Sequence, residues 1–226
     1  MNRNNVSILS NRNVSVLATN KVLRNTYLLL SMTFLFSAFT AYYSFASGAK
    51  PMNIVLMLVG VYGLMFATQA LRNSVWGIVS VFAFTGFLGY TLGPILNMYM
   101  AKYGNGSQLI STALGGTGII FFALSGYVLT TRKDFSFLSG FLFIATMVAM
   151  LAMIAGIFFK VAMLQLIVSA MFMVISSGLI LFQTSEIVRG GETNYISATV
   201  TLFVSIYNLF VSLLQLLGAF SGSSRE

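Results

Sequence analysis

From residue 26 onward, long apolar runs alternate with short polar interruptions. Each run is close to the ~20 residues that an α-helix needs to cross the hydrocarbon core of a bilayer. None has the alternating ~10-residue segments that are typical of an outer-membrane barrel. The pattern therefore predicts an all-α membrane protein, a bundle of seven transmembrane helices over residues 26–47, 51–71, 75–100, 107–131, 135–159, 161–185 and 195–220.

The interruptions are too short to hold a domain outside the membrane, so we expect one bundle over residues 26–220 and a short tail over 221–226. The weakest boundary is at Lys160, where a single cation separates two apolar runs. One helix over 135–185 would be far longer than a bilayer is thick, so we predict a very tight turn at this cation.

The first 25 residues are polar and contain no acidic side chain. Nothing in them could bury a core, so they predict a flexible tail with at most a short surface helix near residues 16–23. Four cations make this tail the part most accessible to a protease or to anionic lipid, namely Arg3, Arg12, Lys21 and Arg24.

The composition agrees with a membrane protein, because 58% of the residues are hydrophobic and only 7% are charged. A soluble domain has about 25% charged residues. The net charge of +8 does not predict a nucleic-acid partner, because the cations lie beside apolar runs, where they set topology and contact anionic lipid. With the tail inside the cell, the inner side holds eight of the 12 cations, so we expect a cytoplasmic N-terminus and a periplasmic C-terminus.

The residue inventory excludes most catalytic chemistry. The chain has no His and no Cys, and Asp134 is its only Asp. A Ser–His nucleophile, a histidine or thiolate metal site and an intramembrane pair of aspartates are therefore all impossible. We expect no enzyme activity, no cofactor and no metal centre.

The last apolar run carries a polar stripe, because its hydrophilic residues recur at spacings that place them on one helical face. Lipid cannot satisfy such groups, so the stripe must face protein or water. Two interpretations remain open, namely hydrogen bonds between helices and a polar core or vestibule around the last helix. The stripe consists of Thr201, Ser205, Asn208, Ser212 and Gln215.

Gln183 and Glu186 lie one turn apart at the end of the sixth run, and Arg189 follows one turn later. The spacing predicts a helix-end ion pair between Glu186 and Arg189. The alternative is a functional site, because ionisable groups at membrane depth are often functional.

Gly89, Gly93 and Pro94 lie in the third run. The two glycines form a small-xxx-small face that lets a neighbouring helix approach closely. Pro94 removes a backbone donor and clashes with the preceding turn, which predicts a kink near Tyr90. The kink serves packing alone or, as in some transporters, belongs to a broken helix that lines a site.

Several tracts resemble a known family. Residues 77–80 and 86–96 resemble the signature of the Bax-inhibitor family. Longer blocks resemble the enterobacterial members of this family that modulate the ATP-dependent membrane protease FtsH, and the resemblance runs from about residue 19 to near the end. These blocks are residues 21–27, 62–66, 82–96, 127–134 and 190–196.

The resemblance implies a bundle with the last helix surrounded by the other six, in the bacterial inner membrane. It also implies an interaction protein that binds FtsH and restrains its proteolysis of other membrane proteins. One mechanism is that the protein occupies the protease as a slowly extracted substrate, gripped by its tail.

The resemblance also offers an alternative function, a calcium leak gated by pH. Calcium-leak members of the family hold two carboxylates, and the matching positions here are Gln183 and Ser205. A carboxylate pair senses pH because each charge raises the pKa of the other group, whereas an amide and a hydroxyl do not ionise. Glu186 lies one turn from Gln183 and is at most a partial substitute, so this departure from the family pattern argues against a calcium site or pH gate here.

Overall fold

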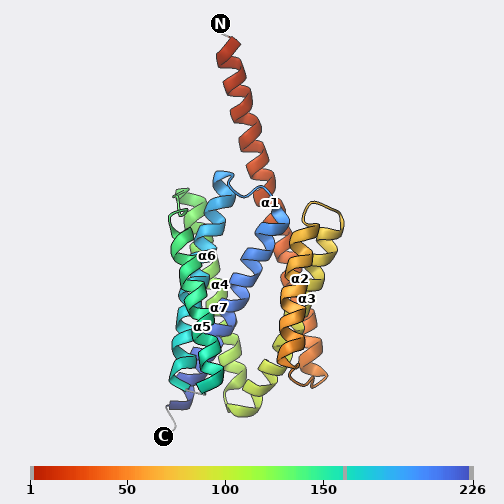
Figure 1. Cartoon of the computed structure of the whole chain (residues 1–226), viewed down its shortest axis with the longest axis vertical. Helices are drawn as coiled ribbons and strands as arrows, with labels where there is room; N and C mark the ends of the chain where they lie inside the picture. The colour runs from red at the N-terminus through yellow and green to blue at the C-terminus, as the bar shows by residue number, and fades with distance from the viewer. Residues whose placement is uncertain (1–2, 160–161, 224–226) are drawn as a thin grey trace.

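The computed structural model describes residues 3–159 and 162–223, which form seven helices joined by short connections (Figure 1). Each helix contains a stretch that is long and apolar enough to cross a membrane, which confirms the predicted fold class and number of spans. The helices are α1 (Arg3–Ala46), α2 (Ile54–Leu71), α3 (Trp76–Lys102), α4 (Gly106–Thr131), α5 (Leu138–Phe159), α6 (Ala162–Arg189) and α7 (Tyr195–Ser223).

The bundle has two ends, which we name by the chain termini that lie beyond them (Figure 1). The N-terminal face comprises residues 19–26 of α1 and the connections 72–75, 132–137 and 190–194. The C-terminal face comprises the connections 47–53 and 103–105. The predicted turn at Lys160 lies outside the described residues.

Two span boundaries lie more than three residues from the prediction. The candidate span in α1 includes residues 19–25, which lie before the predicted start at residue 26. Lys21 and Arg24 can extend their charged ends toward the membrane surface. The sixth span continues to Arg189 because no helix-breaking residue precedes Gly190. Gly190 has a φ of +80° and begins a Schellman motif, in which the Gly191 N–H donates to the Glu186 carbonyl at 2.9 Å.

Helix α1 is longer than the bundle and projects beyond the N-terminal face (Figure 1). The sequence predicted only a short helix near residues 16–23, whereas α1 begins at Arg3. The division of the chain into a tail over 1–25, a bundle over 26–220 and a second tail over 221–226 stays a prediction.

Helix α7 is the central element, and it crosses the bundle between α1–α3 on one side and α4–α6 on the other (Figure 1). It contacts α1, α2, α3, α4 and α6. In the part of the chain that is described, α5 contacts only α6. The arrangement implied by the resemblance is therefore correct for five neighbours of α7 and wrong for α5, which lies outside the ring. Apolar residues of α7 that are almost completely buried form the core with the other helices, among them Leu202, Phe203 and Leu209.

Helices α1 and α3 pack closely against each other, and glycines on α3 allow the close approach. A methyl group at Gly89 would collide with the Ser37 carbonyl oxygen, and one at Gly93 would collide with the Ser44 hydroxyl. This confirms the close approach predicted from the glycine spacing. Helix α3 continues through Pro94 as one helix, so the broken-helix interpretation is wrong, and a kink at Pro94 stays a prediction.

We expect Gly89→Ala to destabilise the bundle by about 1–3 kcal/mol, because the added methyl group forces the α1 backbone away from α3. The measurement is reversible unfolding in mixed detergent micelles, followed by circular dichroism. Gly63→Ala in α2 is the matched control, because no atom lies within 4 Å of a methyl group at that position. Equal stability of the two variants would contradict the role of Gly89.

Candidate functional site

A layer of buried polar side chains lies just below the N-terminal face, where α1, α4, α6 and α7 meet. Gln183 and Ser125 are each six residues from the end of their helices at this face. Thr199 connects α7 to α1, because its hydroxyl lies 3.3 Å from the Thr26 carbonyl oxygen. The layer, called the polar layer below, consists of Thr26, Ser125, Gln183, Thr184, Ser185 and Thr199, all of which are at most 6% exposed.

Hydrogen bonding in the polar layer is incomplete. Thr199 donates to the Tyr195 carbonyl of its own helix at 2.7 Å. Four other members hold a buried polar atom that has no hydrogen-bond partner among the described residues, and these atoms are Thr26 Oγ1, Ser125 Oγ, Gln183 Nε2 and Thr184 Oγ1. Such groups are costly to bury at membrane depth. The layer offers hydroxyl and amide groups but no carboxylate, so it can form hydrogen bonds but cannot exchange protons near neutral pH.

The predicted site residues do not form one cluster. Gln183 lies in the polar layer, and Glu186 is half-buried at the end of α6. Ser205 is buried deeper in α7 and donates to the Thr201 carbonyl of its own helix at 2.8 Å. Asn208 is half-buried one turn further along α7. No hydrogen bond in the described chain joins Gln183 to Ser205, so they do not form a latch of bonded partners.

Within the described part of the chain, the polar stripe of α7 makes one side-chain hydrogen bond to another helix. The Ser169 hydroxyl of α6 donates to the Gln215 Oε1 oxygen at 2.5 Å. Thr201 and Ser205 donate to carbonyls of their own helix instead. The stripe therefore contributes to packing between α6 and α7 at Gln215, and its hydroxyls nearer the N-terminal face are satisfied locally.

The predicted ion pair between Glu186 and Arg189 is wrong, because Arg189 pairs with Asp134 at 2.5 Å. The Schellman motif ends α6 directly after Arg189, and Asp134 lies in the connection beside it. Ser185 supports the same contact, because it accepts from the Phe135 N–H and donates to the Lys133 carbonyl, both at 3.1 Å. The connection 132–137 is thereby fixed to the end of α6.

Asn194 joins the remaining connections of the N-terminal face. Its Oδ1 accepts from the N–H groups of Ile196 and Ser197 at 3.0 Å, which caps α7. Its Nδ2 donates to the Arg72 carbonyl at 3.0 Å and to Asn73 Oδ1 at 2.8 Å. The sequence analysis missed Asn194, although an Asn directly before an apolar helix is a typical N-cap signal.

We expect Ser185→Ala to destabilise the protein by about 1–3 kcal/mol, because it removes two hydrogen bonds, one from the part-buried Phe135 N–H and one to the Lys133 carbonyl. Thermal unfolding in detergent measures the effect. Asp134→Asn is the control that removes only the exposed ion pair, and it should cost much less. A loss for Ser185→Ala no larger than that for Asp134→Asn would contradict this assignment.

The effect of the control substitution Asp134→Asn on stability should depend on pH. The Ser136 N–H and then the Arg189 guanidinium lower the pKa of the Asp134 carboxyl. Its contribution to stability is therefore complete above the ordinary pKa of Asp and disappears as the pH falls through the lowered value. The difference between wild type and Asp134→Asn should be present at neutral pH and absent in strong acid.

Comparisons with known proteins agree with this architecture. A model of the family described as "Inhibitor of apoptosis-promoting Bax1" matches residues 19–222. The "Modulator of FtsH protease YccA" of Escherichia coli K12 is 56% identical over 209 residues, which cover 92% of this chain and 94% of the relative. The same identity and coverage hold for the "Inner membrane protein YccA" of a second E. coli strain. An uncharacterized protein of Pseudomonas aeruginosa is 54% identical over 201 residues, or 89% of this chain and 90% of the relative.

Proposed function

The chain belongs to the Bax1-inhibitor family, and from that premise we propose that it binds the membrane protease FtsH and restrains its proteolysis of other membrane proteins. The observation that carries this proposal is the 56% identity, over almost the whole of both chains, to a protein named as a modulator of FtsH. The chain is a multi-pass protein of the inner membrane. In this proposal the protein acts by binding the protease, and it does not itself catalyse a reaction.

The proposed orientation places the N-terminal face in the cytoplasm and the C-terminus in the periplasm. The distribution of cations supports it, because cytoplasmic connections are enriched in Lys and Arg. Among the described side chains, the C-terminal face holds Lys50 and Lys102. The N-terminal face holds three times as many cations, namely Lys21, Arg24, Arg72, Arg132, Lys133 and Arg189.

The proposed mechanism is slow extraction. FtsH uses ATP, so it must engage a segment on the cytoplasmic side, and the projecting start of α1 with Arg3 and Arg12 provides one. Pulling on α1 then has to separate it from α3 at Gly89 and from α7, where the rings of Phe34 and Phe203 stack at 4.9 Å. Each central Leu, Ile, Phe or Val leaving the membrane adds about 0.3–0.6 kcal/mol of resistance. The protease is occupied while extraction proceeds.

Deletion of residues 2–17 should abolish both the association with FtsH and the turnover of this protein, because it removes the segment to be engaged. The deletion leaves in place the described contacts of α1 with the bundle, such as the one between the Thr26 carbonyl and the Thr199 hydroxyl. The measurements are a pull-down from solubilised inner membrane and a pulse-chase in cells. A chain with residues 2–17 in scrambled order is the control and should behave as wild type. Unchanged association and turnover of the deletion would refute the mechanism.

The second candidate function, a calcium leak, is disfavoured by the uncharged Gln183 and Ser205. We expect the purified protein in proteoliposomes to show no calcium flux that changes between about pH 6 and pH 8, because neither side chain ionises there. The double variant Gln183→Glu with Ser205→Asp restores two carboxylates and shows whether the assay responds to them. A clear pH-dependent flux through the wild-type protein would favour the leak.

A further inference from the structure

An apolar groove with a volume of about 780 Å³ runs along the bundle between α1 and α4. Among the described residues, no Cα atom of α1 lies within 8 Å of one of α4, so side chains of other helices form the base of the groove. Helix α7 supplies this base with Phe203, Ile206, Tyr207 and Phe210, and α3 contributes Leu92, Leu96 and Met100.

The groove opens toward the surroundings of the bundle. Its rim includes Tyr42 of α1 and Leu114 and Phe122 of α4, which are 68%, 57% and 73% exposed. All three lie within candidate membrane spans, so these surfaces face lipid. A groove at this position is filled from the membrane and not from water.

The dimensions of the groove select the kind of occupant. On α1 it extends from Tyr27 to Phe45, which is about 27 Å of helix and close to the hydrocarbon thickness of a bilayer. One extended hydrocarbon chain can therefore lie along the whole groove. The side chains that line it on α1, α3, α4 and α7 are mostly apolar, which matches the surface of an acyl chain.

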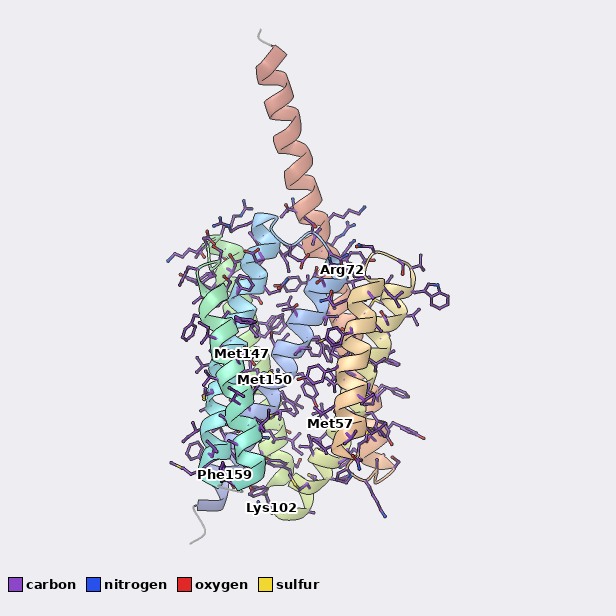
Figure 2. The ribbon with its side chains drawn as sticks, in the orientation of Figure 1. Met57, Arg72, Lys102, Met147, Met150 and Phe159 are labelled. Carbon is purple, nitrogen blue, oxygen red and sulfur yellow. The ribbon has the colours of Figure 1, made fainter. Side chains whose placement is uncertain are left out.

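The charge at one end of the groove indicates where the head group of a bound lipid lies. Met100 and Ser107 line this end, and Lys102 lies between them in the chain, with its ammonium 5.3 Å from the centre of the Tyr103 ring (Figure 2). Lys50, on the connection that follows α1, lies on the same face. The described acidic residues, Asp134, Glu186 and Glu192, all lie near the opposite face, so no described carboxylate competes with a phosphate for Lys50 or Lys102.

We propose that the groove binds one acyl chain of an anionic phospholipid, with the lipid phosphate beside Lys102. The chain fills the space that α1 and α4 leave between them and covers the base formed by α7. The head group stays at the C-terminal face, where its charge is balanced. This site is independent of the proposed interaction with FtsH.

Two glycines of α4 provide a matched test. Gly118 lines the groove, whereas Gly115 does not, and no atom lies within 4 Å of a methyl group placed on either. Gly118→Trp should therefore block the groove, and Gly115→Trp adds the same side chain elsewhere on α4. Both variants are first compared with wild type by circular dichroism and thermal unfolding in detergent.

The measurement is native mass spectrometry of delipidated protein titrated with phosphatidylglycerol or phosphatidylethanolamine. Wild type and Gly115→Trp should retain one tightly bound phosphatidylglycerol, and Gly118→Trp should lose it. Lys102→Gln leaves the groove intact and should weaken phosphatidylglycerol binding about fivefold, with little effect on phosphatidylethanolamine. Arg72→Gln, at the opposite face, is its control and should not change binding (Figure 2).

Equal lipid retention by the two tryptophan variants would overturn the proposal. An unchanged affinity of Lys102→Gln for phosphatidylglycerol would also overturn the proposal. This second measurement tests the proposal even if Gly118→Trp does not fold. A third contrary result is a second protein chain that copurifies in place of lipid with wild type and Gly115→Trp but not with Gly118→Trp. That result would overturn the proposal and assign the groove to a protein.

Discussion

The close approach of α1 to α3 is the contact on which the rest of the structure depends. Inside a bilayer, apolar side chains gain little by leaving lipid for protein, so helices associate through tight packing and hydrogen bonds. Gly89 and Gly93 let α3 lie against the backbone of α1, and Asn97 adds a hydrogen bond to the Phe45 carbonyl at 3.0 Å. Helix α1 is thereby held on one side by α3 and on the other by α7. A protease that extracts the chain from the N-terminus has to break this contact to remove α1.

The N-terminal face adds a second layer of resistance, because hydrogen bonds connect segments that are distant in the chain. Asn194 bonds to the connection between α2 and α3, and Ser185 bonds to the connection between α4 and α5. Thr199 reaches the Thr26 carbonyl of α1. Withdrawal of α1 therefore disturbs this face of the bundle, which is the cytoplasmic face in the proposed orientation. Helix α5 differs, since it contacts only α6 among the described residues.

The sequence was sufficient for features that depend on local composition. Apolar run length predicted the seven spans, and the spacing of Gly89 and Gly93 predicted a close helix approach. The end of α6 was predicted too early, at residue 185, although Gly190 is the first residue beyond it that readily adopts a positive φ. The start of α1 could not be predicted, because a polar helix that leaves the membrane has the composition of a tail.

Features that depend on the neighbours of a helix could not be predicted. Glu186 is the local partner that helix spacing offers to Arg189, but the fold brings Asp134 to it from 55 residues away in the chain. Likewise, the gap between α1 and α4 follows from the position of α7, and no residue of either helix indicates it. The resemblance placed all six helices around α7, and only the structure shows that α5 lies outside.

The most direct test of the central claim is the rate at which purified FtsH degrades this protein in proteoliposomes, measured for a series of substitutions along the α1–α3 contact. Their unfolding free energies are determined in the same lipid. If release of α1 limits extraction, the logarithm of the degradation rate should rise in proportion to the stability lost at this contact. A rate that stays constant while the contact is weakened would contradict the claim.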